Sequence, residues 1–422
     1  MVSDENIYDV IVVGAGPGGS TTAAYLGRLG RRVLLLDKAK FPRDKTCGDA
    51  LSGKSMRVLR ELGLVESMQK LPHGEIKGVV FSSPSRDCAA IEFQAADPNR
   101  AGGRGLCIRR MHTDNVFFNA AKKTKNVTVR EQFQVQDVLR ENGHVVGVKG
   151  LDLSDSKRAE MTFRSKVVVG SDGVNSAVTR SVLGAKAALD PAHSCDAVRG
   201  YYSGIKGLTD KIEIHFVKSI MPGYFWIFPL DDGTANVGLG LVSKDLQAKM
   251  KKNGANLVQM MDGVIKEEPM FKERFADAKP ISPITGWRLP FGSARRPLSG
   301  DGWLLVGDAA SLVDPFSGEG VGNASASGRL AAQFIDEALE RGDVSKVSLG
   351  RYEVAVWEEL GTELSTSYSM QRLGRYEWLL NLVVRKAVKS PKVRELISAS
   401  LSNEEAKKKF ENPLTYLWLL LT

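Results

Sequence analysis

The feature that most constrains this chain is a glycine-rich turn between two short apolar runs near its start. A β-branched run breaks into a G-x-G-x-x-G pattern at Gly14, Gly16 and Gly19, and a helical pattern follows. The second apolar run, residues 33–36, ends at Asp37. This order of strand, glycine turn, helix, strand and acid predicts a βαβ unit of the dinucleotide-binding kind.

The glycines and the acid of this unit each have a physical reason to be there. Gly14 permits the tight turn, Gly16 lets the backbone approach a pyrophosphate, and Gly19 allows helix and strand to pack closely. Asp37 stands where a carboxylate can accept hydrogen bonds from both hydroxyl groups of a ribose. Because strand, helix and acid all fall where the fingerprint needs them, we interpret the stretch as a dinucleotide site and not as a chance glycine-rich turn.

Length and composition bound the class of protein. A chain of 422 residues is too long for one ordinary core and predicts two joined domains. A hydrophobic share of 43% and a charged share of 25% are typical of folded soluble proteins, which argues against disorder and against a membrane-spanning bundle. The net charge of +9 favours anionic partners such as phosphates or an acidic membrane surface. Nucleic acid is not predicted as a partner, because the sequence has no recognition module and no long basic run.

The cysteines and histidines indicate the compartment and argue against a metal centre. Cys47, Cys88, Cys107 and Cys195 are far apart and form no C-x-x-C pair, and no charged leader with an apolar core opens the chain. We therefore expect a cytoplasmic protein, and association with the inner face of the membrane stays open. The five histidines show no ligand spacing, so no metal is predicted.

One pattern points to a different class of protein. Residues 48–55 fit the phosphate-loop pattern G-x-x-x-x-G-K-[ST] letter for letter. A true phosphate loop directly follows a buried strand, whereas this stretch follows a polar segment. A nucleotide hydrolase is therefore disfavoured.

Two later stretches have the same character as the first glycine turn. Residues 170–180 contain a G-x-D-G pattern after a β-branched run, and residues 307–322 carry Gly-Asp-Ala after another strand pattern, with further glycines before a helix. Such glycines would aim backbone N–H groups and the positive helix end at an anion or an electron-rich ring. Asp308, like Asp37, directly follows a buried strand, and its alternative role is that of an N-cap.

The three fingerprints in this order resemble those of the p-hydroxybenzoate hydroxylase-like branch of FAD-dependent oxidoreductases, over residues 8–330. The resemblance implies FAD as a bound cofactor. Asp37 replaces the commoner Glu, which shortens the reach of that contact. Position by position, the resemblance assigns Asp37 to the adenosine ribose, Arg110 to the phosphates, Val135 to the adenine through its backbone, Asp308 to the ribityl or ribose region, and Gly320 and Val321 to the isoalloxazine.

Within this branch, two motifs resemble the geranylgeranyl reductase family. Residues 42–50 are similar to its P-x-x-x-x-C-G segment beside the flavin, and residues 224–229 with 236–240 are similar to its Y-x-W-x-F-P and N-V-G-x-G roof. Halogenases have a related G-W-x-W-x-I-P stretch, from which this chain departs at two positions. The resemblance places Cys47, Gly48 and Ala50 against the cofactor, and Tyr224, Trp226 and Phe228 along the substrate.

The chemistry of alkene reduction says what such a site must contain. Hydride passes from the reduced flavin to one carbon and a proton to the other, so the site must be apolar, dry and long enough for a prenyl chain. Tyr224, Phe225, Trp226 and Phe228 suit its wall, although alternate members of this run can be plain core. Cys47 is the candidate catalytic residue, as a flavin-adjacent thiol that donates the proton. Asp49 and solvent are its rivals, and a small buried hydrophobe is the alternative reading of the thiol.

The resemblance implies an FAD-dependent reductase that saturates the prenyl double bonds of a geranylgeranyl lipid or geranylgeranyl diphosphate. A flavin-dependent monooxygenase or halogenase is the alternative enzyme. A lipid-binding flavoprotein without turnover is the alternative from another class. The sequence does not decide whether the electron donor is NADPH or a ferredoxin.

The expected fold is α/β, with a glutathione-reductase-type Rossmann FAD-binding domain, an inserted antiparallel-sheet substrate domain and a helical C-terminal region. The expected division is residues 1–75, 101–182 and 297–345 for the FAD-binding domain, 76–100 and 183–296 for the substrate domain, and 346–422 for the helical region.

Helical periodicity predicts helices at residues 55–64, 111–122 and 244–266. The apolar run at residues 412–422 is too short to span a bilayer. Beside the basic residues 407–409, it caps the substrate tunnel, lies in a membrane interface or docks onto its own core, and the sequence leaves these three open.

Overall fold

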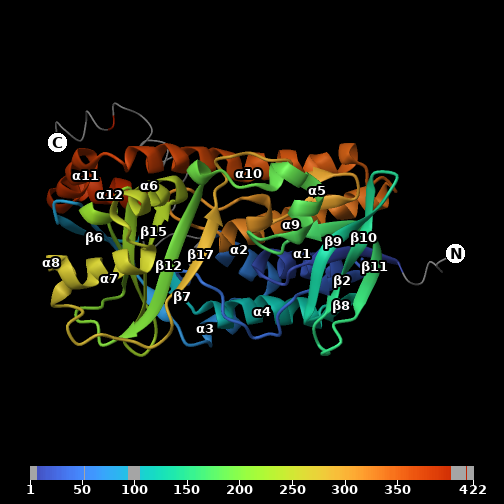
Figure 1. Cartoon of the computed structure of the whole chain (residues 1–422), viewed down its shortest axis with the longest axis horizontal. Coiled ribbons are helices and arrows are strands. Elements are labelled where there is room, and N and C mark those ends of the chain that lie inside the picture. The colour runs from blue at the N-terminus through green and yellow to red at the C-terminus, as the bar shows by residue number, and fades with distance from the viewer. Residues whose placement is uncertain (1–6, 52, 94–104, 401–414, 416–422) are drawn as a thin grey trace.

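The computed structural model describes residues 7–51, 53–93 and 105–400, together with Thr415 (Figure 1). Within these residues the chain builds two sheets of eight strands, one toward each end of an elongated molecule. Helix α10 (Lys346–Leu373) runs along the upper side in Figure 1 and links the two ends. Apart from Thr415, the apolar run at residues 412–422 and the basic residues 407–409 lie outside the described residues.

The first sheet is built on the βαβ unit that the glycine pattern predicts. Strands β1 (Ile7–Val13) and β2 (Val33–Leu36) pair in parallel, with Val13 opposite Leu36. Their apolar side chains are buried on both faces, as a parallel sheet covered by helices requires. The path through the sheet is β18 (Ser299–Gly300), β19 (Trp303–Leu305), β11 (Glu160–Gly170), β1, β2, β8 (Val127–Arg130), and the hairpin of β9 (Phe133–Glu141) and β10 (His144–Asp152) extends from β11.

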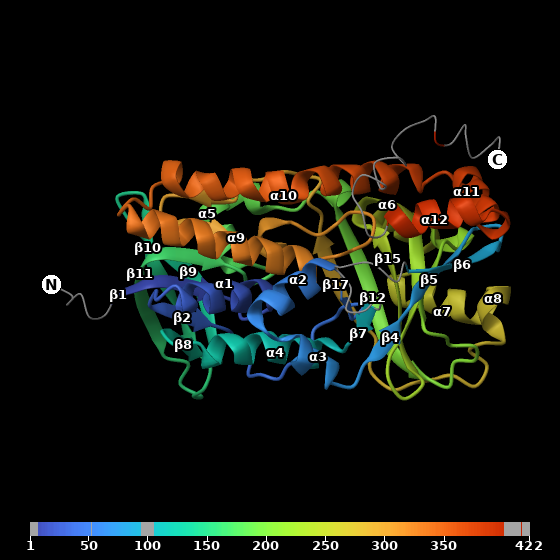
Figure 2. The same cartoon turned by 180° about the vertical axis from the view of Figure 1, so that it is seen from behind.

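Small residues let two helices approach closely over this sheet. Helix α1 (Pro17–Arg28) packs against α9 (Val321–Glu340). A Cβ atom at Gly328 would lie 2.5 Å from the Gly18 carbonyl oxygen, so only glycine fits at this crossing. The Thr22 hydroxyl donates to the Gly328 carbonyl at 3.2 Å and ties the two helices together. Figure 2 shows α1 and α9 from the opposite side, with α4 (Arg110–Lys123) below them.

The second sheet is mostly antiparallel. Its path is β16 (Lys279–Pro280), β12 (Ser194–Ser203), β15 (Thr234–Val242), β14 (Gly223–Pro229), β13 (Lys211–His215), β5 (Gly78–Ser82), β6 (Cys88–Glu92), and β17 (Thr285–Pro290) also pairs with β12. One face packs on α7 (Leu257–Glu267) and α8 (Pro269–Lys272) around Phe225 and Phe271. The other face turns toward the first sheet.

Shorter elements join the two sheets and cover their edges. A three-stranded sheet contains β3 (Ala50–Leu51), β7 (Gly105–Cys107) and β4 (Gly74–Ile76), and further helices are α2 (Gly53–Leu62), α3 (Val65–Gln69), α5 (Ala177–Leu183), α11 (Glu377–Lys389) and α12 (Pro391–Ser400). The last two helices pack on β6. Among the residues described, no helix is both long and apolar enough to cross a membrane.

One predicted helix was wrong. Residues 244–266 form two helices, α6 (Ser243–Asn253) and α7, and not one. Gly254 adopts φ 72°, a left-handed conformation that ends α6, and Asn256 then caps α7 with Gln259 in a capping box. The predictions at residues 55–64 and 111–122 correspond to α2 and α4, each shifted by one or two residues.

Candidate active site

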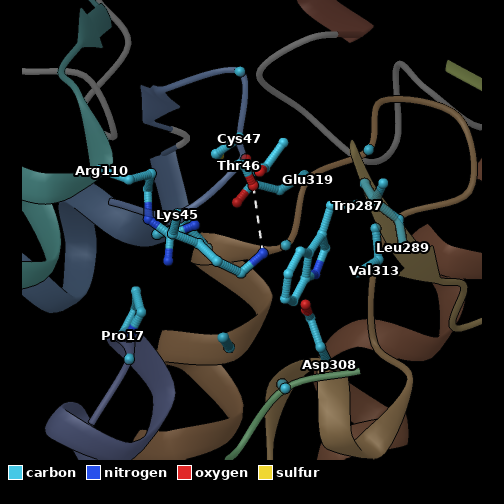
Figure 3. Close-up of a pocket in the computed structure, with 18 of the residues that line it drawn as sticks. Pro17, Lys45, Thr46, Cys47, Arg110, Trp287, Leu289, Asp308, Val313 and Glu319 are labelled. Carbon is cyan, nitrogen blue, oxygen red and sulfur yellow. Dashed lines mark hydrogen bonds between the residues drawn. The ribbon is translucent and has the colours of Figure 1, made fainter. Parts of the chain in front are cut away.

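A cavity of about 1050 Å³ lies between the two sheets and receives nearly all of the residues singled out from the sequence. Figure 3 shows part of its wall, with Cys47, Arg110 and Asp308 facing a common space. Gly19 is the exception: a Cβ atom there would lie 1.8 Å from the Gly14 carbonyl oxygen, so Gly19 serves helix packing. The predicted residues that line the cavity are Gly14, Gly16, Asp37, Cys47, Gly48, Ala50, Arg110, Val135, Tyr224, Trp226, Phe228, Asp308, Gly320 and Val321.

Asp37 is held in place at one end of the cavity by backbone N–H groups. Ala15 donates to Oδ2 at 2.7 Å and Ala39 donates to Oδ1 at 2.8 Å. The residue is 8% exposed and lines the cavity at the end of β2. Because a carboxylate oxygen can accept more than one hydrogen bond, Asp37 keeps acceptor capacity for a ligand hydroxyl.

The N-terminus of α1 and two arginines form an anion site next to this acid. No side chain of the described residues caps α1 at Gly16, so the backbone N–H groups that follow Pro17, which itself has none, stay available to a ligand. An Arg43 guanidinium nitrogen lies 3.6 Å from the position of a Cβ on Gly16. Asp114, fully buried, pairs with Arg110 through two hydrogen bonds of 2.6 and 2.9 Å and with Arg43 at 3.0 Å. Sequence reasoning missed Arg43 and Asp114.

The second fingerprint supports the cavity wall. A Cβ atom at Gly14 would lie 2.4 Å from the Ser171 carbonyl oxygen, so the first and second fingerprints meet backbone to backbone. Asp172 accepts the backbone N–H of Ala177 at 2.7 Å and a hydrogen bond from the Ser176 hydroxyl at the start of α5. This carboxylate therefore fixes a loop.

Asp308, in the third fingerprint, lies inside the 3-10 turn Gly307–Ala310 and lines the cavity. One of its carboxylate oxygens lies 3.5 Å from the position of a Cβ on Gly320, the residue before α9. No side chain caps α9 at Gly320. The N-cap alternative for Asp308 is thus not the arrangement in the structure.

A lysine and a tryptophan that the sequence did not single out face each other in the middle of the cavity. The Lys45 ammonium lies 3.8 Å from the centre of the Trp287 ring (Figure 3). Burial lowers the pKa of Lys45 to about 8, although Asp308 opposes this shift. The Trp287 Nε1 atom is buried and has no hydrogen-bond partner among the described residues. A buried hydrogen-bond donor without a protein partner indicates that a bound ligand supplies the acceptor.

Asp49 is a buried carboxylate of the cavity wall with a raised pKa. It is 1% exposed and accepts hydrogen bonds from Tyr201 Oη at 2.9 Å, Asn236 Nδ2 at 2.7 Å and the Arg110 backbone at 3.1 Å. Burial raises the pKa of Asp49 to about 6, and the hydrogen bonds from Asn236 and Tyr201 oppose that shift. Asn236 also donates to the Cys47 carbonyl at 2.7 Å, so one amide fixes both residues of the loop.

The roof of the cavity is the face of the second sheet that carries the predicted aromatic motif. Tyr224, Trp226 and Phe228 line the cavity. The expectation for Phe225 was wrong, because Phe225 and Ile227 point to the opposite face and are fully buried there. This alternation is that of a β-strand with two different faces.

The phosphate-loop pattern has another role. Lys54, its lysine, donates to Asn323 Oδ1 at 3.1 Å and pairs with Glu363 on α10. The lysine therefore connects α2 to α9 and α10.

The fold and the site together define an FAD-dependent flavoprotein. FAD fits the residues present: an acid at the end of β2, a helix N-terminus with two arginines, a second helix N-terminus at α9, and a tryptophan N–H in the cavity. Neither helix has a side-chain cap, and the N–H has no partner, among the described residues.

Comparison with known proteins agrees with this class. Residues 7–331 match the FAD binding domain family. A digeranylgeranylglycerophospholipid reductase of Methanocella arvoryzae is 30% identical over 87% of each chain. A menaquinone reductase of Mycobacterium tuberculosis is 31% identical over 79% of this chain and 78% of the other.

Solved structures show the same fold. A geranylgeranyl bacteriochlorophyll reductase-like protein of Thermoplasma acidophilum superposes with a TM-score of 0.82 and 26% identity, over 96% of this chain and 99% of the other. A flavin-dependent brominase superposes with a TM-score of 0.75 and 23% identity, over 97% and 98%, and shows the fold alone. The chain belongs to the FAD-binding domain family and is an FAD-dependent oxidoreductase of the geranylgeranyl reductase type.

Proposed function

We propose that this protein saturates the prenyl double bonds of a geranylgeranyl lipid or of geranylgeranyl diphosphate. The observation that carries the proposal is an apolar lobe that continues the cofactor cavity under the second sheet. Its lining side chains are Ile76, Val79, Phe81, Ile212, Ile214 and Phe216. A long apolar lobe beside the cofactor suits a prenyl chain and keeps water away from the reacting carbons.

The cofactor contacts complete this proposal. Asp37 would hold the adenosine ribose, and Arg110, joined by Arg43, would face the phosphates. Val135 would meet the adenine through its backbone, and Asp308 the ribityl chain. The common lining of one cavity by all these residues supports the assignment.

When bound in its reduced form, FAD supplies hydride to one carbon of the alkene. The chain itself must orient the alkene and deliver a proton to the other carbon. Cys47 is our candidate for that donor, with Asp49 as its rival on the same loop. Both line the cavity, and Asn236 holds the loop at the Cys47 carbonyl and the Asp49 carboxylate.

The test is anaerobic turnover of an unsaturated digeranylgeranyl phospholipid, with dithionite, NADPH or reduced ferredoxin as donor. We expect products that carry two added hydrogens for each saturated double bond, detected by mass spectrometry. Products that contain oxygen or halogen, formed only in air, would replace the proposal by a monooxygenase or halogenase. Lipid binding without any turnover would indicate a carrier.

A further inference from the structure

Arg199 is a buried cation on the cavity wall that lacks a full set of partners. It is 1% exposed, and its Nε atom has no hydrogen-bond partner among the described residues. Its one ion pair within the described part of the chain is with Asp44 at 2.7 Å, and the Asp44 side chain is 52% exposed. A carboxylate or phosphate frequently binds a guanidinium through two nitrogens, whereas among the described residues Arg199 contacts an anion through Nη2 and its Nε has no partner.

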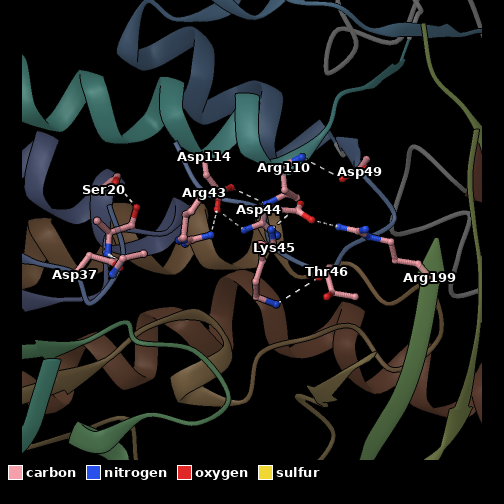
Figure 4. A network of polar contacts seen from close by, with 12 residues as sticks. Ser20, Asp37, Arg43, Asp44, Lys45, Thr46, Asp49, Arg110, Asp114 and Arg199 are labelled. Atoms are coloured by element: carbon pink, nitrogen blue, oxygen red, sulfur yellow. Dashed lines mark hydrogen bonds and ion pairs between the residues drawn. The ribbon is translucent and has the colours of Figure 1, made fainter. Parts of the chain in front are cut away.

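The surroundings of Arg199 carry charges of both signs, because the carboxylates Asp44 and Asp49 both interact with it. Arg199 and Arg109 both lie over the ring of Tyr201, at 4.3 and 4.7 Å. The Nε atom of Arg109 is also buried and has no hydrogen-bond partner in the part of the chain that the structure describes. Figure 4 shows Arg199 at the end of the polar network opposite to Asp37, beyond Asp44 and Lys45. The site is thus separate from the anion site at the start of α1.

Strand register connects Arg199 to the apolar lobe. Arg199 on β12 pairs with Gly238, which pairs with Trp226, which pairs with Ile214 on β13, which pairs with Phe81 on β5. Directly paired residues share a face, so these five residues form one row across the roof. At about 4.8 Å per strand, the row is about 19 Å long, with a cation at one end and apolar side chains at the other.

We propose that Arg199 binds the phosphate or diphosphate group at the head of the prenyl substrate, whose chain runs along this row toward Phe81. The proposal rests on the proposed function, because it assigns the direction of the same substrate. It also makes Asp44 the carboxylate that occupies Arg199 until the anion arrives. A phosphate of a nicotinamide donor has the same chemistry, and the experiment separates the two sources.

The test uses the FAD-loaded protein and two ligands that differ in the head group, geranylgeranyl diphosphate and geranylgeraniol. Binding is followed by the change in flavin absorbance. The wild type should bind the diphosphate at least about tenfold more tightly than the alcohol, as expected for charge-assisted hydrogen bonds. Arg199→Gln should lose about that factor for the diphosphate and leave the affinity for the alcohol unchanged.

The variant Asp44→Asn tests whether Arg199 binds the substrate anion or only holds the loop of Cys47 through its ion pair with Asp44. If Arg199 binds the substrate anion, removing the competing carboxylate should strengthen diphosphate binding and leave the alcohol unaffected. If the pair only holds the loop of Cys47, both variants should weaken both ligands, which would overturn the proposal. Arg288→Gln is the matched control, because Arg288 pairs with Asp196 at 2.8 Å on the neighbouring strand and is about half exposed. An equal loss of diphosphate affinity in this control would also contradict the assignment.

Turnover and donor kinetics separate the remaining outcomes. If the wild type reduces neither of these ligands nor the digeranylgeranyl phospholipid, the proposed function fails and the head-group assignment fails with it. If it reduces both and Arg199→Gln keeps the preference for the diphosphate, the function stands and the assignment to Arg199 is overturned. A defect of Arg199→Gln confined to flavin reduction by NADPH, without prenyl ligand, would assign the site to the donor and overturn our proposal.

Discussion

The Tyr201 hydroxyl donates a hydrogen bond of 2.9 Å to the buried Asp49 carboxylate, across 152 positions of the chain. Asp49 sits two residues after Cys47, and Tyr201 comes from strand β12 of the second sheet. The bond therefore joins the cofactor loop to the roof of the cavity. Ionisation of the Asp49 carboxylate costs free energy at this buried position, because burial raises its pKa from 3.8 to about 6.

This pKa predicts a pH dependence of stability. Between about pH 4 and pH 6 the unfolded chain releases the Asp49 proton and the folded protein keeps it. The contribution of Asp49 protonation to the free energy of unfolding is therefore complete below pH 4 and is lost as the pH rises through 6. The shift corresponds to about 3 kcal/mol. The variant Asp49→Asn should lose this pH dependence. In urea titrations, its free energy of unfolding relative to that of the wild type should therefore increase between pH 4.5 and pH 7.5. The exposed Asp262→Asn should follow the wild type, and an unchanged difference would contradict the role of burial.

Asp37→Ala should weaken FAD binding. The variant loses the acceptor of the Ala15 and Ala39 backbone N–H groups and the acceptor for the ribose. Hydrogen bonds to a charged group contribute about 1.5–3 kcal/mol, so we expect the Kd for FAD to rise by at least about tenfold. Equilibrium dialysis with flavin fluorescence measures it. Asp9→Ala, at the other end of the same sheet and paired with Lys166, should keep wild-type affinity, and equal losses would refute the assignment.

FAD affinity should also fall with rising pH above about 8. Lys45 loses its charge there in the cofactor-free protein, because burial lowers its pKa to about 8, and a bound anionic cofactor favours the charged form. Lys45→Met should bind FAD more weakly and show no such fall. The measurement is the Kd for FAD from pH 7 to 9.5. A parallel decline in the wild type and the variant would show that another group is responsible.

Ile214→Trp should shorten the apolar lobe. Ile214 lines the cavity beside Phe81, and a larger ring would fill the space that the far end of a long chain needs. We expect the turnover rate of geranylgeranyl substrates to fall by at least about tenfold. Geranyl substrates should keep their turnover rate, because their shorter chain does not reach the space that the new ring fills. Ile281→Trp, on the exposed surface, serves as the control. Equal losses for both chain lengths would place the prenyl chain elsewhere.

The parts of the site that depend on neighbours in sequence could be predicted. The turn at Gly14 and the acid Asp37 are encoded by one continuous strand–helix–strand segment, and the alternation of Tyr224, Trp226 and Phe228 gives their common face. The break between α6 and α7 was also signalled locally, by Gly254 and Asn256. It was missed because the apolar spacing continues across it.

The pairs that depend on tertiary packing could not be predicted. Lys45 meets Trp287 from a distant strand, and Arg199 meets Asp44 across 155 positions. Neither pair has a spacing or a motif, because each exists only once the register of the second sheet and the path of the cofactor loop are fixed. The polarity of the row across the roof, with Arg199 at one end and Phe81 at the other, follows from that register.

The most direct measurement is reoxidation of the reduced flavin by a prenyl substrate, in a stopped-flow instrument without oxygen. The FAD-loaded protein is reduced with dithionite and mixed with geranylgeranyl diphosphate or the phospholipid. We predict recovery of the oxidised flavin spectrum in proportion to the double bonds saturated, with the reduced lipid as the product. A reduced flavin that stays reduced until air is admitted would contradict a prenyl reductase.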